Sequence, residues 1–183
     1  LHAADRGVGF SGPGNRGWPA LVAAGLATTP RDPIALLGEH RIGMTDLVKR
    51  ATARASELRP AEYRHGLGRL DRLCAWLRPA AVCVVGLTGW RHAVGRRAGA
   101  GEQPEVLGGR PVWVMANPSG LNAATSLDDL VAHLHAAAQL AQRSATSAQR
   151  GASRRIARNP GRPAFASCRL IDAPGLSPML SRS

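Results

Sequence analysis

The sequence predicts an α/β fold in which a parallel sheet carries helices on its faces. Two short, continuous runs rich in apolar, β-branched residues, Ala80–Leu87 and Pro111–Ala116, are typical of strands buried on both faces. Longer segments with apolar residues at helical spacing lie before, between and after them. Because strands that alternate with helices form parallel sheets, both observations favour the same architecture.

Three helices and one further strand complete this prediction. Asn15–Ala27 has helical periodicity and stops near Pro30, and Ala61–Leu77 places a row of leucines on one face. Arg41–Val48 is a short candidate for a third strand. The last helix, Leu127–Gln142, follows a serine N-cap, and two aspartates in its first turn favour the positive helix start.

The composition changes after residue 142. Residues 143–183 are mostly Ser, Ala, Arg, Gly and Pro with little periodicity, which predicts one domain over 1–142 followed by a basic, mostly disordered tail. The net charge of +12 suggests a polyanionic partner, nucleic acid first. The tail holds eight arginines and one aspartate, a net +7, which leaves +5 for residues 1–142. The tail either adds non-specific DNA affinity or is merely solvated.

Several protein classes are disfavoured. No apolar run approaches the roughly 18 residues of a membrane span, and the first residues do not resemble a signal peptide. The three cysteines, Cys74, Cys83 and Cys168, are widely spaced and odd in number, which argues against a disulfide framework and fits a reducing compartment. They are also too few for a four-cysteine iron–sulfur cluster. The six histidines show no metal-ligand spacing, so we predict no metal site.

The segment Asn117–Asn122 (N-P-S-G-L-N) is the first place to look for a site. It follows a predicted strand directly, and ligands of parallel sheets bind at the carboxyl ends of strands. Gly120 permits close approach to a backbone such as that of DNA, and Leu121 is an apolar residue suited to wedge into a base stack. Alternatively, Leu121 folds back onto the core, and the pattern alone favours this second reading.

Phe10 stands alone in a glycine-rich segment. Such an aromatic can stack on a base, or it can pack against the helix that follows, which the pattern alone favours. Gly7–Gly12 also matches G-x-G-x-x-G, but a dinucleotide site needs a strand before it and a helix immediately after. Neither is predicted here, so a nucleotide-binding α/β protein is only a third hypothesis.

Taken in order, four segments resemble the mismatch-specific uracil-DNA glycosylase family, relatives of thymine-DNA glycosylase. They are F-x-G-P-G-N-R-x-W, G-M-T-D-L-V-K-R, a buried strand running to V-G-L, and V-W-V-M-A-N-P-S-G-L-N. The resemblance implies a three-layer α/β/α fold with a short parallel sheet. It implies a monofunctional, monomeric enzyme of the bacterial cytoplasm and nucleoid that needs no cofactor. Such an enzyme flips uracil, thymine or ethenocytosine out of double-stranded DNA at G·U-type mismatches and hydrolyses the N-glycosidic bond.

The resemblance also assigns roles to residues. Phe10 matches the aromatic that stacks on the flipped base, Asn117 lies close to the base edge, and Ser119 contacts a phosphate. The wedge that fills the vacated stack corresponds to Gly120, Leu121, Asn122 and Ala123.

Three departures from the family pattern matter. The family's G-I-N-P-G motif, whose asparagine positions the attacking water, would stand with the first strand directly before Leu1 and is absent from the 183 residues. Losing such a group costs about 10²- to 10⁴-fold in rate. We therefore expect an N-terminally truncated, impaired chain with no catalytic residue of its own. Gly17 replaces an aromatic, which predicts a packing gap, and Ala123 replaces a longer wedge residue, which predicts a weaker grip on the opposite strand.

A second hypothesis comes from a different functional class. The chain could be a non-catalytic remnant that binds mismatched DNA through Phe10, Leu121 and the basic tail. An in-frame G-I-N-P-G segment upstream of Leu1 would favour the enzyme.

Overall fold

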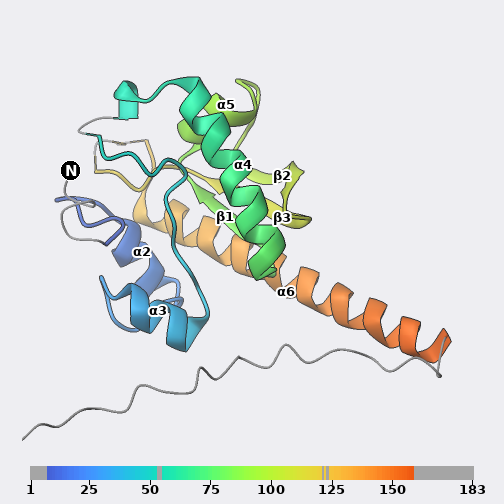
Figure 1. The fold of residues 1–183 in the computed structure, drawn as a ribbon. Helices are drawn as coiled ribbons and strands as arrows, with labels where there is room; N and C mark the ends of the chain where they lie inside the picture. The colour runs from blue at the N-terminus through green and yellow to red at the C-terminus, as the bar shows by residue number, and fades with distance from the viewer. Residues whose placement is uncertain (1–7, 53–54, 121, 123, 159–183) are drawn as a thin grey trace, which may run out of the picture. The chain divides into compact units, whose positions relative to one another are not determined.

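A three-stranded mixed sheet lies at the centre of the described residues, which in this computed structural model are 8–52, 55–120, 122 and 124–158. The strand order is β1-β3-β2 (Figure 1). Strands β1 (Val82–Val85) and β3 (Arg110–Met115) run parallel, with Val82 opposite Val112 and Val85 opposite Met115. Both predicted strands and their parallel arrangement are thus confirmed: β1 is two residues shorter than predicted at each end, and β3 lies one residue earlier in the chain.

The third strand, β2 (Gly101–Leu107), was not predicted. It pairs antiparallel with β3 through a tight turn at Gly108 and Gly109, whose φ angles are 55° and 73°. Two positive φ angles are typical of the turns that join hairpin strands. Strand β2 is mostly exposed and contains Pro104, so it lacks the apolar run by which its neighbours were recognised. The sheet is therefore mixed rather than wholly parallel.

Five helices longer than one turn and a single 3₁₀ turn occur in the described ranges. They are α2 (Gly17–Ala23), α3 (Pro33–His40), η1 (Ala55–Glu57), α4 (Pro60–Leu77), α5 (Leu87–Val94) and α6 (Leu127–Arg158). The prediction for α4 is accurate within one residue, and α2 is shorter than predicted at both ends. Neither α3 nor α5 was predicted. No helix among these is both long and apolar enough to cross a membrane.

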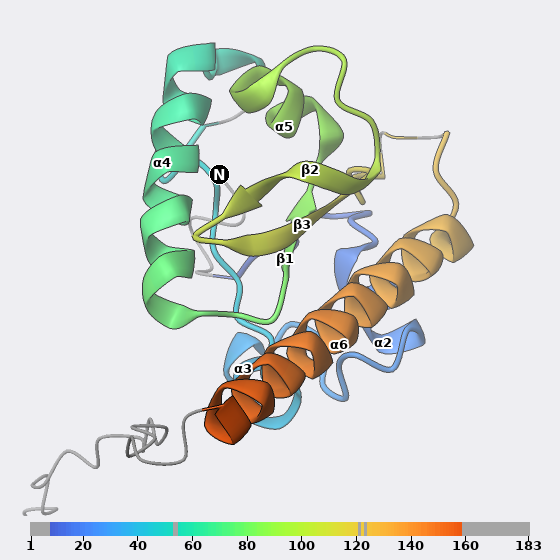
Figure 2. The same ribbon diagram turned by 90° about the vertical axis from the view of Figure 1, so that its right-hand side faces the viewer.

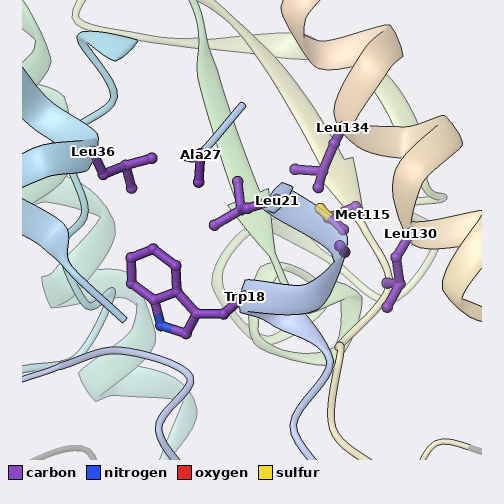
Figure 3. Close-up of a cluster of buried hydrophobic side chains, with 8 residues drawn as sticks. Trp18, Leu21, Ala27, Leu36, Met115, Leu130 and Leu134 are labelled. Atoms are coloured by element: carbon purple, nitrogen blue, oxygen red, sulfur yellow. The ribbon is translucent and has the colours of Figure 1, made fainter. Parts of the chain in front are cut away.

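Helices cover both faces of the sheet (Figure 2). On one face, Val84, Val112 and Val114 pack with Leu70 of α4 and Trp90 of α5. The other face of the sheet contributes Met115 to a second cluster with residues of α2, α3 and α6 (Figure 3): Trp18, Leu21, Leu36, Leu130 and Leu134. Because side chains alternate along a strand, β1 and β3 each contribute to both clusters, whereas β2 contributes only Leu107 to the first.

The start of α6 was correctly predicted. The Ser126 hydroxyl accepts from the backbone N of Asp129 at 3.0 Å, and the Asp129 carboxylate accepts from the backbone N of Ser126 at 2.8 Å. This reciprocal pair is a capping box. The helix continues past Gln142 to Arg158, so residues 143–158 are helical rather than part of an irregular tail. Residues 159–183 lie outside the described residues, and the division into a domain and a tail stays a prediction.

The predicted strand Arg41–Val48 is wrong, because this segment is irregular. It crosses α4 at Gly66, where a Cβ atom would overlap the carbonyl oxygen of Leu47. Its backbone is held by a side chain instead of a neighbouring strand, since Arg69 of α4 donates to the carbonyl of Asp46. The apolar residues of the segment therefore pack without forming a ladder.

Candidate functional site

The loop between β3 and α6 lies where a site was predicted. It leaves the carboxyl end of β3, and the parallel strand β1 ends at the same edge of the sheet. The backbone N of Gly86, just after β1, donates to the carbonyl of Met115 at 3.0 Å. The two strand ends are thereby tied together at the edge where parallel sheets bind ligands.

Polar side chains within the loop define its shape. The Asn117 amide oxygen accepts from the backbone N of Ser119 at 3.0 Å, which closes a turn of the kind that asparagine favours. The Asn122 amide nitrogen donates to the carbonyl of Asn117 at 3.2 Å and to the Thr125 hydroxyl at 3.0 Å. Pro118 between them is buried, while Asn117 stays exposed. Asn117 and Asn122 therefore help to build the loop, and Asn117 remains accessible.

The glycine-rich segment before α2 docks directly onto this loop. The backbone N of Arg16 donates to the carbonyl of Pro118 at 2.9 Å. Gly120 approaches so closely that a Cβ atom would lie 2.7 Å from the carbonyl oxygen of Gly14. Any side chain at position 120 would push the two segments apart. Two segments about a hundred residues apart in sequence are thus held against each other.

Arg16 strengthens this contact with its side chain. Nη2 donates to the carbonyls of Asn122 at 2.9 Å and Ser119 at 3.4 Å, and Nη1 donates to the carbonyl of Thr125. Sequence analysis did not identify this role. The only signal was the place of Arg16 in G-P-G-N-R, because contacts between a side chain and distant carbonyls leave no periodic pattern.

Phe10 packs against the start of α2. Its backbone has a φ of 58°, and its half-buried ring would lie 2.6 Å from a Cβ atom on Gly17. The segment is fixed further by Trp18, whose indole N donates to the carbonyl of Gly9 at 2.8 Å. The gap expected at Gly17 is therefore filled by the Phe10 ring. This arrangement agrees with the packing role weighed for Phe10, and base stacking stays a prediction.

An open hollow of about 510 Å³ lies beside the loop, between β3 and α6. Its lining includes Ala116 and Thr125 of the loop, with Trp113 and His133 opposite, but neither Phe10 nor Asn117. The Trp113 indole N donates to Nδ1 of His133 at 3.3 Å. Ser119, Gly120 and Asn122 lie in the contact between the two loops, and none of them is in the lining of this hollow.

Ser119 and Gly120 lie in the contact with the glycine-rich segment, whereas Leu121 and Ala123 fall outside the described residues. Burial raises the pKa of the Cys83 thiol to about 12, so this cysteine is not a nucleophile near neutral pH. Within the described ranges, no group of three or more His, Cys, Asp or Glu side chains could hold a metal ion.

A family model described as the uracil DNA glycosylase superfamily matches residues 1–141, which include both loops and the whole sheet.

Proposed function

Because the chain belongs to the uracil DNA glycosylase superfamily, we propose that it derives from a repair enzyme that excises uracil from G·U mismatches. Superfamily membership indicates a DNA glycosylase of base-excision repair. Such an enzyme must first extrude the base, and extrusion costs least at a mispair. This cost favours a mismatch over a Watson–Crick pair. The finer assignment to the mismatch-specific and thymine-DNA glycosylase branch is supported by the resemblance of the F-x-G-P-G-N-R-x-W and N-P-S-G-L-N segments.

The contact between the two loops is the observation that supports this proposal most. It places Asn117 exposed beside Gly120, at the carboxyl edge of the sheet, on a loop held by Arg16. In the proposed complex, Asn117 contacts the edge of the flipped base and Ser119 contacts a phosphate. Gly120, Leu121, Asn122 and Ala123 form the wedge, and the Leu121 side chain enters the vacated stack.

Phe10 has a conditional role in this proposal. In the observed arrangement its ring rests on Gly17 and supports the start of α2. Stacking on a flipped base would use the part of this half-buried ring that Gly17 does not cover. We keep Phe10 as the aromatic contact for the base on that condition.

Hydrolysis also needs a group that positions the attacking water. The two asparagines of the loop 116–126 bond the loop itself, because Asn117 accepts from Ser119 N and Asn122 donates to the Asn117 carbonyl and the Thr125 hydroxyl. We propose that the water is positioned by the asparagine of a G-I-N-P-G segment that the 183 residues do not contain. On this account the 183 residues bind and distort DNA but cleave it slowly.

The test is a single-turnover cleavage assay on a G·U duplex, with the 183-residue chain beside a chain extended upstream by the G-I-N-P-G strand. We expect alkali-labile abasic sites from the extended chain, at a rate at least about 10²-fold higher. In the extended chain, Asn117→Asp keeps the oxygen that accepts from Ser119 N but removes the amide donor. It should therefore slow cleavage while leaving the fold intact.

A non-catalytic DNA-binding protein is the second candidate. It is favoured by the loop chemistry, because the amide, hydroxyl and backbone groups of the loop 116–126 can hydrogen-bond to DNA, and no acidic or basic side chain is there to act as a general base. If neither chain cleaves the duplex and both bind the mismatch more tightly than matched DNA, this second function is correct. Absence of both cleavage and mismatch preference would contradict both candidates.

A further inference from the structure

The Arg16 guanidinium binds three evenly spaced backbone carbonyls of the 117–126 loop. It donates to the carbonyls of Ser119, Asn122 and Thr125, which are three residues apart. The loop makes turns with the same spacing, since the backbone N of Asn122 donates to Ser119 O at 2.9 Å and that of Thr125 to Asn122 O at 3.5 Å. Arg16 therefore binds the carbonyl oxygens that begin and end these turns.

Only arginine can make this set of bonds from one position. The guanidinium presents five N–H donors in a rigid planar fork, whereas lysine presents a single ammonium group. The side chain is half-buried, and within the described part of the chain its Nε is buried without a hydrogen-bond partner. Arg16 is thus committed to the loop and is not an exposed contact for a ligand.

The bonds to Arg16 also orient the outer side of the loop. In a planar trans peptide the C=O and the following N–H point in opposite directions. Since the carbonyl of Ser119 is turned toward Arg16, the N–H of the exposed residue Gly120 points away from the guanidinium. Backbone N–H groups turned outward, with a positive charge behind them, are suited to bind an anion.

We propose that Arg16 is a positioning residue for DNA binding. It holds the loop so that the N–H of Gly120 faces a backbone phosphate, and it does so without touching DNA. This role rests on the proposed function, because it presumes that the loop binds a phosphodiester backbone. Loss of Arg16 then weakens DNA binding more than the loss of one positive charge does.

The test compares three variants of the full chain. Arg16→Gln removes the charge and the fork, and Arg16→Lys keeps the charge but loses the fork. Arg69→Gln is the matched control, because Arg69 also donates to a backbone carbonyl, that of Asp46, outside the candidate site. Affinity for a G·U duplex is measured by fluorescence anisotropy, and amide hydrogen exchange of Asn122 and Thr125 is measured without DNA.

Arg16→Gln should raise Kd by about tenfold to 100-fold, the range expected when charge-assisted hydrogen bonds are lost. Arg16→Lys should also raise Kd clearly, whereas Arg69→Gln should change it less than about threefold. Both Arg16 variants should speed exchange of the loop amides. If Arg16→Gln unfolds the protein, Arg16→Lys decides the matter by the same two measurements.

Three outcomes overturn the role. If Arg16→Lys binds like the unsubstituted chain, only the charge matters. If the loop amides exchange faster but DNA affinity stays the same, Arg16 shapes the loop without serving binding. If the unsubstituted chain binds neither matched nor mismatched DNA, the proposed function fails and this role fails with it. The first two outcomes leave the proposed function intact.

Discussion

Gly17 and Phe10 share one small space at the start of α2. A methyl group on residue 17 would lie within 2.6 to 2.9 Å of three Phe10 side-chain atoms. Alanine favours helices over glycine by up to about 1 kcal/mol, but overpacking costs about 1–3 kcal/mol. We expect Gly17→Ala to lower the free energy of unfolding by about 1–2 kcal/mol, measured by urea denaturation.

Two controls separate overpacking from a general effect of the substitution. Gly38 of α3 has no atom within 4 Å of a Cβ added there, so Gly38→Ala should stabilise the protein by about 0.5–1 kcal/mol. In a Phe10→Ala background, Gly17→Ala should cost nothing, because the ring that it displaces is gone. A cost that persists without Phe10 would contradict the shared space.

At the scale of elements, α4 and the irregular segment 41–52 pack closely against each other at Gly66. A Cβ atom on Gly66 would overlap the Leu47 carbonyl, which is backbone and cannot rotate away. Gly68 of the same helix would meet only the end of the Arg72 side chain, at an ordinary 3.8 Å. Both glycines lie within α4, away from its ends, so they differ chiefly in the atoms that surround them.

This difference predicts that a glycine-to-alanine substitution changes the free energy of unfolding in opposite directions at the two positions. Gly66→Ala should lower the free energy of unfolding by about 3 kcal/mol or more, since the crossing segment must move. Gly68→Ala should raise it by about 0.5–1 kcal/mol through helix propensity alone. Urea denaturation of both variants checks this. Equal effects would mean that the segment does not cross the helix at Gly66.

Elements with a strong periodic signal were predictable from the sequence, and those held by side chains or turns were not. Strands β1 and β3 are continuous apolar runs, and helix α4 carries an apolar face. Strand β2 is polar and exposed, α3 and α5 have eight residues each, and segment 41–52 mimics a strand by its apolar residues alone. Weak or short patterns of this kind leave the outcome to tertiary contacts.

The candidate site, too, was predictable from the sequence only in part. Its location after β3 followed from a general rule for parallel sheets, and the N-P-S-G-L-N motif marked the loop. The partners of the loop were not predictable, because the close approach of Gly120 to Gly14 and the bonds of Arg16 join segments far apart in sequence. Only the folded chain brings these groups within hydrogen-bond distance.

At the scale of the whole molecule, charge is concentrated toward the C-terminus. Two compact units are found, Leu1–Ala148 and Gln149–Ser183. The second contains seven arginines and one aspartate, so it carries +6 of the net +12. A cut after Ala148 therefore removes half of the net charge. It also retains Arg143, whose guanidinium forms an ion pair with Glu102 of β2 at 3.2 Å.

Removing residues 149–183 should make DNA binding less dependent on salt while leaving the preference for a mismatch unchanged. Each phosphate neutralised by a cation contributes about −0.9 to the slope of log K against log salt concentration. The truncated chain should therefore lose about 1 or more from that slope, and at most about 6 if every net charge contacts a phosphate. Phosphate contacts carry no sequence information, so the ratio of affinities for G·U and matched duplexes should persist. Anisotropy titrations from 50 to 300 mM salt, on the order of physiological values, measure both quantities. An unchanged slope would show that the C-terminal arginines do not contact DNA. A lost mismatch preference would show that the C-terminal unit, and not the loops, recognises the mismatch.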